Sequence, residues 1–248
     1  MSLADLQSHP FIRKVLDDAM KVQREAGIKP LADPNDDPLL NEQQFYITRV
    51  GFSLSHLLTW VEQLHHAVHF LAQFNYERRT KEAGVNRFHH LIYNVENYLV
   101  RLQSVYDRLL QLTNNVFHIC MSEELVNHSL IVSNLRVSRT KVPQTLRAVR
   151  KTIEPKATAR NEIVHRHSYS DPLFRRLELF YMQTEAAWAS SSGKLQFKDL
   201  AHMRAQMMKK ATTSKRAEFE AINVALVRAL APLFNELHVQ YEKQKSGF

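Results

Sequence analysis

The clearest feature of the sequence is a repeated spacing of apolar residues by three and four positions. An α-helix has about 3.6 residues per turn, so this spacing places the apolar side chains on one face. The pattern predicts two long amphipathic helices, paired as an antiparallel hairpin with Gly84 in the connection. The first stripe consists of Leu54, Leu58, Val61, Leu64, Val68 and Leu71, and the second of Phe88, Leu91, Val95, Tyr98, Leu102, Val105, Leu109, Leu112 and Val116.

A third stripe lies near the C-terminal end of the sequence and is interrupted by Pro232. Proline inside a helix removes a backbone hydrogen bond, so we expect Pro232 to kink this helix or to divide it in two. The stripe consists of Phe219, Ile222, Leu226, Leu230, Leu233, Leu237 and Tyr241.

Glycine and proline positions divide the rest of the chain. They predict an N-terminal helix of about residues 10–26 that ends at Gly27, a connector at 29–38 and a flexible linker at 190–194. Asp171 is a predicted N-cap. Three prolines are expected in the first turns of short helices, namely Pro143, Pro155 and Pro172.

The composition favours helices over sheet, because five glycines and eight prolines are too few for the turns of a sandwich or barrel. We predict an all-α fold, a helical bundle with a long antiparallel helix hairpin and shorter helices. It is divided into an N-terminal helix and connector (1–40), a helical core (41–190) and a C-terminal helical extension packing on the core (191–248).

Cysteine content and hydropathy indicate the cellular compartment of the protein. The single cysteine, Cys120, excludes an internal disulfide and a multi-cysteine zinc site, and we interpret it as a small buried apolar residue. No stretch approaches the roughly 20 apolar residues that span a bilayer, and the first residues do not resemble a secretory signal. We expect a cytoplasmic protein that does not contact a membrane.

Positive charge is concentrated in one part of the chain. Of 33 basic and 25 acidic residues, 11 basic and three acidic ones lie between Arg136 and Arg176. Such a region attracts polyanions, most commonly nucleic acid, although a solvated basic face or an acidic protein partner would also account for it. The basic run 207–216 is interpreted as a solvated helix face or an additional RNA contact. The candidate nucleic-acid contacts are Arg147, Arg150, Lys151, Lys156, Arg166, Arg175 and Arg176.

Residues 160–169 combine side chains suited to phosphate chemistry. Asn161 and His165 are four apart on the predicted helix, so the amide is placed to hold one imidazole nitrogen. Glu162 and Arg166 have the same spacing and are expected to pair. Arg160 and His165 are about 140° apart around an ideal helix, so their joint use on one substrate calls for long side chains or a partner surface.

The segment from Arg160 to His165 matches the R-N-x-x-x-H signature and thereby resembles the HEPN superfamily of all-helical proteins, many of which are ribonucleases or toxins. The helix at 94–117 resembles the long core helix of a HEPN-like bacterial family, and the resemblance covers about residues 41–190. It implies cleavage of RNA without metal or cofactor, in which the ribose 2′-hydroxyl attacks the neighbouring phosphate. Arg160 would stabilise the phosphorane, His165 would transfer protons and Asn161 would orient His165. The signature commonly lies at a homodimer interface, where two copies form one cleft.

A second pattern competes for the histidine. Arg160, His167 and Tyr169 resemble the R-x(4–6)-H-x-Y pattern of HEPN toxins paired with a nucleotidyltransferase antitoxin, which modifies the tyrosine. We prefer His165 because Asn161 directly follows Arg160. The other explanation of the segment is a capped helix end with cations near its negative dipole. In that case the protein is a non-catalytic helical module that binds nucleic acid or protein through its basic surface.

Other histidines do not predict a metal site. His65, His66 and His69 share one predicted helix, and His89 and His90 lie on the next. The segment lacks the glutamate of H-E-x-x-H, and histidines at helix interfaces more often form hydrogen bonds.

Overall fold

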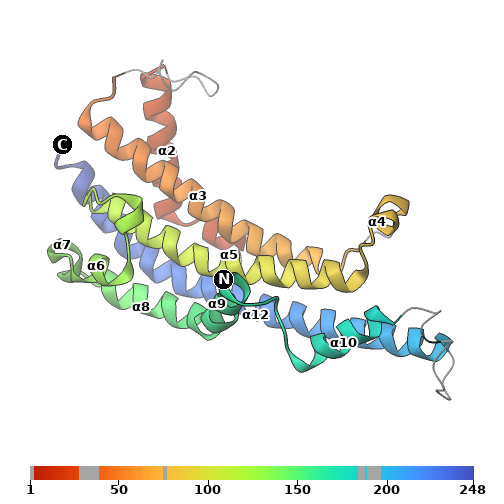
Figure 1. The fold of residues 1–248 in the computed structure, drawn as a ribbon. Helices are drawn as coiled ribbons and strands as arrows, with labels where there is room; N and C mark the ends of the chain where they lie inside the picture. The colour runs from red at the N-terminus through yellow and green to blue at the C-terminus, as the bar shows by residue number, and fades with distance from the viewer. Residues whose placement is uncertain (1–2, 28–38, 75–76, 184–187, 189–196) are drawn as a thin grey trace. The chain divides into compact units, whose positions relative to one another are not determined.

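The computed structural model describes residues 3–27, 39–74, 77–183, 188 and 197–248, and every described element is a helix (Figure 1). The predicted all-α fold is confirmed. The predicted connector at 29–38 and linker at 190–194 lie outside the described residues. The helices are α1 (Leu3–Gln7), α2 (Pro10–Glu25), α3 (Glu42–Phe70), α4 (Arg78–Glu82), α5 (Arg87–Val116), η2 (Glu123–Leu125), α6 (His128–Ser133), α7 (Leu135–Ser138), α8 (Val142–Ile153), η3 (Glu154–Lys156), α9 (Ala157–His165), α10 (Pro172–Met182) and α12 (Phe197–Lys245).

The chain forms two compact units, each assembled from separate stretches of sequence. Unit 1 consists of Met1–Gln63, Leu102–Pro155 and Val224–Phe248, and unit 2 of Leu64–Arg101 and Lys156–Asn223. The three long helices α3, α5 and α12 contribute residues to both units.

The predicted hairpin is present. Within unit 1, the Tyr46 hydroxyl near the start of α3 donates a 2.9 Å hydrogen bond to the carbonyl of Val116 at the end of α5. Further along α3, the Trp60 ring lies 4.4 Å from the guanidinium carbon of Arg108, which precedes Val116 in α5. The two helices are therefore antiparallel, and all stripe residues are buried except the half-buried Leu58.

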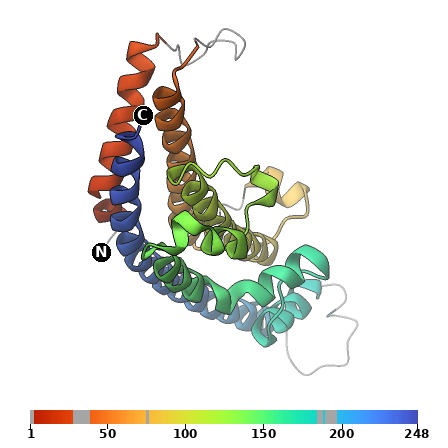
Figure 2. The ribbon, with the colours of Figure 1, turned by 90° about the vertical axis from the view of Figure 1, so that its left-hand side faces the viewer.

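In unit 1, α2 packs against α3 and the C-terminal part of α12 (Figure 2). The rings of Phe11 and Phe234 lie 5.6 Å apart, and the Tyr241 hydroxyl donates to Asp18 at 3.0 Å. A Cβ built on Gly51 of α3 would lie only 2.8 Å from the Cβ of Ala19. The close approach of α2 and α3 therefore requires glycine at position 51.

The core of unit 2 contains a buried polar group that the sequence pattern did not predict. Asn223, rather than the predicted Ile222, is buried on α12. Its amide donates to the carbonyl of Leu64 at 3.3 Å and accepts from the hydroxyl of Tyr98 at 3.0 Å. The Tyr98 ring stacks on Phe219 with centroids 3.7 Å apart. The buried Asn223 amide and Tyr98 hydroxyl thus both have partners, as burial demands.

Two expectations about prolines are corrected by the structure. Pro232 was expected to kink its helix or to divide it, and the division is wrong, because α12 runs unbroken from Phe197 to Lys245 with Pro232 inside it. Pro155 lies in the short 3₁₀ turn η3, and α9 begins two residues later at Ala157.

The other helix boundaries follow the predicted chemistry. Pro143 and Pro172 lie in the first turns of α8 and α10, and the Asp171 carboxylate caps α10 by accepting from two backbone N–H groups at 2.9 Å. Gly27 and Gly84 have φ of +66° and +70°, a conformation that glycine adopts without strain.

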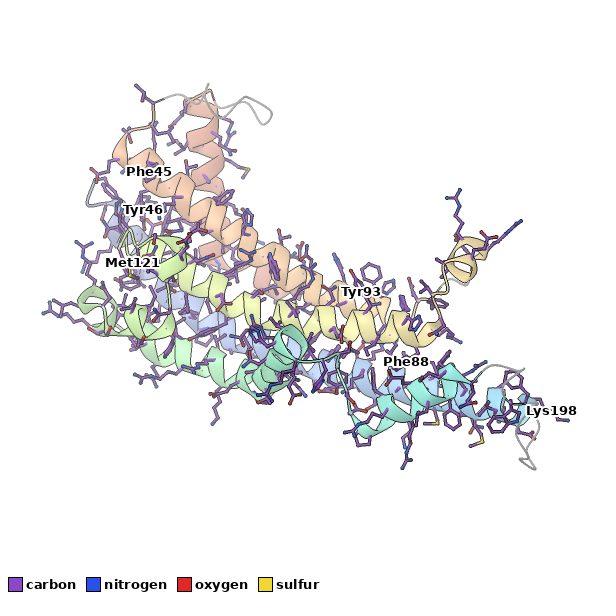
Figure 3. The ribbon with its side chains drawn as sticks, viewed as in Figure 1. Phe45, Tyr46, Phe88, Tyr93, Met121 and Lys198 are labelled. Carbon is purple, nitrogen blue, oxygen red and sulfur yellow. The ribbon has the colours of Figure 1, made fainter. Side chains whose placement is uncertain are left out.

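The interpretation of Cys120 as a buried residue is wrong. Its side chain is exposed, and its φ of +61° belongs to a sharp turn after α5, in which His118 also has a positive φ of +48°. The Asn114 side chain supports this turn by bonding to both the N–H and the carbonyl of Met121. Tyr46 and Met121 lie at the same end of unit 1 (Figure 3). No described helix is long and apolar enough to cross a membrane.

Candidate functional site

The candidate residues lie on α9, a helix with no buried side chain. Arg160 is half-buried, whereas Asn161 and His165 are exposed. A helix without a buried apolar face gains little stability from hydrophobic packing. Contacts at its two ends are therefore expected to contribute much of what holds it in unit 2.

Asn161 and His165 line an open hollow on unit 2, together with Thr158, Glu162 and Arg166. The expected hydrogen bond between Asn161 and His165 is absent from the described residues, because Asn161 Oδ1 accepts instead from Arg160 Nη1 at 3.0 Å. His165 forms no hydrogen bond or ion pair within the described part of the chain. Its imidazole is therefore open to contact by a bound molecule.

Arg160 does not line this hollow. Its Nε is buried and has no hydrogen-bond partner among the described residues. A buried donor without an acceptor costs about 1–3 kcal/mol, so an acceptor supplied by a ligand or partner would be stabilised here. The expected Glu162–Arg166 ion pair is also absent from the described residues; the Arg166 backbone N–H donates to the Glu162 carbonyl at 2.8 Å.

Both ends of α9 are tied to α12 by polar contacts within unit 2. At the N-terminal end, Lys156 forms an ion pair with Glu218. Beyond the C-terminal end, Lys215 Nζ donates to the Tyr169 hydroxyl at 2.7 Å and to Glu218 at 2.9 Å. The Tyr169 hydroxyl in turn donates to Asp171 Oδ2 at 3.0 Å. These five residues form one network, which we call the Lys215 network.

The surroundings of the Lys215 network favour its charged form at neutral pH. Burial acts to raise the pKa values of Asp171 and Glu218, but hydrogen bonds to each carboxylate and the charge of Lys215 bring both below their ordinary values. Burial acts to lower the pKa of Lys215, and the contacts with Tyr169 and Glu218 raise it overall. Burial raises the pKa of Tyr169 despite the nearby Lys215. The carboxylates are thus ionised, the lysine is charged and the phenol is neutral.

The two residues of the alternative pattern, His167 and Tyr169, differ in exposure and in their contacts. His167 is exposed, and its Nδ1 lies 2.9 Å from the Ser168 carbonyl. Tyr169 is half-buried, and its backbone N–H donates to Glu96 at 2.6 Å. Because the Tyr169 hydroxyl is held by two partners, its modification would require both contacts to open.

The candidate nucleic-acid contacts differ in whether a carboxylate neutralises their charge. Lys156 is neutralised by Glu218, and Arg150 lies 4.0 Å from Glu154. The others form no ion pair within the described residues and are exposed: Arg147 and Lys151 on α8 in unit 1, and Arg166, Arg175 and Arg176 in unit 2.

Sequence reasoning missed Lys215 and Glu218 as supports of the site. Lys215 belongs to the basic run 207–216, yet only 12% of its side chain is exposed, so the interpretation of that run as a solvated face is wrong at this position. The spacing of Lys215 and Glu218 by three residues was a signal of a helical ion pair. It gave no indication that the pair faces Tyr169, 46 residues away in the chain.

The remaining histidines have local roles. His90 contacts the Asn94 amide at 3.2 Å, and burial lowers the pKa values of His65 and His90. Within the described residues, no group of three or more His, Cys, Asp and Glu side chains could hold a metal ion.

Comparison with known proteins identifies a family. The family described as HEPN_Cthe2314-like HEPN matches residues 47–223, which include α5, α9 and the Lys215 network. No curated protein and no solved structure matches the chain. Since the match covers most of the 248 residues, the chain belongs to the HEPN_Cthe2314-like HEPN family.

Proposed function

We propose that this protein is a metal-independent endoribonuclease that uses Arg160 and His165. The observation that carries the proposal is the placement of the R-N-x-x-x-H residues on an exposed helix of a HEPN domain, with the His165 imidazole unpaired within the described residues. An unpaired imidazole suits proton transfer at a phosphate, and an arginine suits stabilisation of its negative charge.

The reaction needs no group beyond these side chains and the RNA. A base removes the proton of the ribose 2′-hydroxyl, whose oxygen forms a bond to the adjacent phosphorus. The bond from phosphorus to the 5′-oxygen breaks, and that oxygen receives a proton. His165 serves in this proton transfer, and Arg160 offers planar donors to the equatorial oxygens, where negative charge accumulates.

We further propose that the active site combines two copies of the chain. Arg160 does not line the hollow that contains Asn161 and His165, so one copy brings only part of the catalytic set to that surface. HEPN domains commonly act as dimers. A second copy that places its Arg160 over this hollow would complete the set.

The substrate class is supported by charge. Arg147 and Lys151 in unit 1 and Arg166, Arg175 and Arg176 in unit 2 are exposed cations without an ion pair among the described residues. Contacts between such residues and RNA phosphates release counterions, so binding should weaken steeply with rising salt.

One observation favours a second candidate, a non-catalytic helical module that binds RNA or protein in the cytoplasm. In the single chain, Asn161 is engaged by Arg160 rather than by His165, so the catalytic residues do not form a connected set. A role as a toxin or in defence belongs to the ribonuclease proposal. If His167 is the catalytic histidine instead of His165, the ribonuclease proposal also includes a nucleotidyltransferase antitoxin that modifies Tyr169.

The test is incubation of purified protein with labelled mixed RNA, with and without EDTA. Cleavage should persist in EDTA and yield products with 2′,3′-cyclic phosphate ends. His165→Ala should slow cleavage by about 10²- to 10⁴-fold with RNA affinity almost unchanged, and His167→Ala should have a small effect. Arg160→Lys should rescue the Arg160→Ala loss poorly, because an ammonium group lacks the planar fork. If the parent protein cleaves no RNA, the ribonuclease proposal is refuted and the non-catalytic binding module is supported.

Mixing two inactive variants tests the shared site. In a dimer of one Arg160→Ala chain and one His165→Ala chain, one composite site loses both groups and the other keeps both. Activity should therefore return on mixing. If each chain held a complete site of its own, the mixture would stay inactive, and a strictly monomeric protein that cleaves RNA would also contradict the shared site.

A further inference from the structure

A second hollow lies in unit 1, and none of its lining residues belongs to α9. Its volume is about 420 Å³, within the range of small-molecule sites. Its lining comes from three places: the end of α5, α7 with the turn that follows it, and the last turns of α12. The lining residues are Val116, Phe117, Arg136, Arg139, Thr140, Gln240, Lys243 and Gln244.

The charged residues of this hollow are all cations. None of its eight described lining residues carries a carboxylate, whereas three carry a positive charge. Arg136 Nη1 contacts the Phe117 carbonyl at 3.5 Å. Arg139 and Lys243 are exposed and form no ion pair within the described residues.

Neighbouring carboxylates do not neutralise these cations. Lys245, two residues after Lys243, pairs with Asp18 at 2.8 Å and with Glu242 at 3.0 Å. The nearby acidic groups are thus occupied by a different lysine. The C-terminal ends of α5 and α12 contribute about half a negative charge each, which leaves a surplus of about two positive charges.

Concave geometry strengthens the effect of this surplus. Like charges around a hollow with low-dielectric walls repel one another and focus a positive potential into it. An anion that enters relieves the repulsion. Gln240 and Gln244 are four apart on α12, so both amides can face the same ligand and add neutral donors.

We propose that this hollow is a phosphate-binding site that holds one phosphate group of an RNA. Guanidinium and ammonium groups with amide donors are the side chains that recognise phosphate oxygens. The assignment to RNA rests on the proposed function, while the affinity for phosphate rests on the hollow alone. Gln240, Lys243 and Gln244 lie beyond the family match at 47–223, so the site joins the HEPN domain to the chain's own C-terminal segment.

The phosphate has two chemical sources, a terminal monoester or an internal diester. The test uses the full chain and a short 2′-O-methylated RNA that cannot be cleaved, prepared with either a 5′-phosphate or a 5′-hydroxyl. The site variant is Arg139→Gln with Lys243→Gln. The control, Arg13→Gln with Lys21→Gln, removes one arginine and one lysine charge from exposed positions on α2 of the same unit.

Pyrophosphate should raise the Tm of the parent and the control but not of the site variant. The site variant should bind the RNA at least about tenfold more weakly than the control, with a salt dependence reduced by about one phosphate contact. If the 5′-hydroxyl RNA binds the parent as weakly as the site variant binds phosphorylated RNA, the ligand is the terminal phosphate. If both RNAs bind the parent equally and the variant loses both, the ligand is an internal phosphate.

Equal RNA affinities for the site variant and the control, with equal responses to pyrophosphate, would overturn the proposal. That result leaves the ribonuclease proposal intact, because cleavage by Arg160 and His165 is measured separately. Conversely, a parent protein that binds RNA through this hollow yet never cleaves it would refute the ribonuclease and support the phosphate site.

Discussion

The Lys215→Met substitution tests whether polar contacts, rather than a hydrophobic face, hold the candidate site in place. Methionine keeps the length and apolar character of the lysine stem but removes its charge and donors. The Lys215 ammonium donates to Tyr169 at 2.7 Å and to Glu218 at 2.9 Å, and it lies 3.6 Å from Asp171. Only 12% of the side chain is exposed, so water cannot fully replace these contacts.

The expected magnitude follows from those contacts. A hydrogen bond that involves a charged group contributes about 1.5–3 kcal/mol, and Lys215 makes two. The side chains of Asp171 and Glu218 are 28% and 27% exposed, so their lost partner is partly replaced by water. Glu218 also keeps its ion pair with Lys156. We therefore expect the free energy of unfolding to fall by about 3 kcal/mol, which is the lower end of the range of about 3–6 kcal/mol for two such bonds.

The assays separate a local loss from a global one. Urea denaturation measures the free energy of unfolding, and hydrogen exchange with mass spectrometry measures the opening of residues 157–171. Because α9 has no buried side chain, its amides should exchange up to about 100-fold faster in Lys215→Met, which corresponds to about 3 kcal/mol. The matched control is Lys210→Met, an exposed lysine on the same helix, which should change stability by less than about 0.5 kcal/mol.

Equal stability and equal exchange of α9 in Lys215→Met and Lys210→Met would refute this reasoning. The position of α9 would then be set by backbone connections to its neighbours. Slower RNA cleavage by Lys215→Met with unchanged exchange of α9 would also contradict a purely positioning role.

Three further predictions concern the core. Gly51→Val should destabilise the protein by about 1–3 kcal/mol in urea denaturation because the new Cβ lies within 2.8 Å of Ala19, and Ala19→Gly should recover part of that loss; no recovery would contradict the contact. Burial lowers the pKa of His9, whose Nδ1 accepts a hydrogen bond from the Phe11 N–H. The folded protein therefore binds fewer protons than the unfolded chain, and its stability should fall as the pH drops below about 6.5. The variant His9→Asn keeps a cap acceptor, and its thermal denaturation should depend less on pH in this range. Asn223→Leu should cost about 2–4 kcal/mol in urea denaturation. It removes one of the two acceptors of the buried Tyr98 hydroxyl and the amide donor to the Leu64 carbonyl, and a neutral result would show that the pocket rearranges around leucine.

Local chemistry in the sequence was sufficient for the helices and many of their ends. Periodic apolar residues identified the hairpin, since a helical face is set by spacing within one segment. Asp171 and Gly84 were predictable because capping and positive φ depend on adjacent residues. The R-N-x-x-x-H residues were likewise visible, because their spacing lies within two helical turns.

Tertiary structure alone decided which groups surround the candidate site. Lys215 and Tyr169 are 46 residues apart, and no periodicity indicates that two exposed-looking polar residues will meet in a half-buried network. The surroundings of Arg160 and His165 also depend on the rotation of α9 in unit 2, which its own sequence does not fix because it has no buried side chain. In the same way, Arg139 and Lys243 line one hollow only because α12 returns its last turns to the end of α5. Spacing along the chain determines a helix and its faces, whereas contacts between distant segments determine which charges are neutralised and which remain free to bind a ligand.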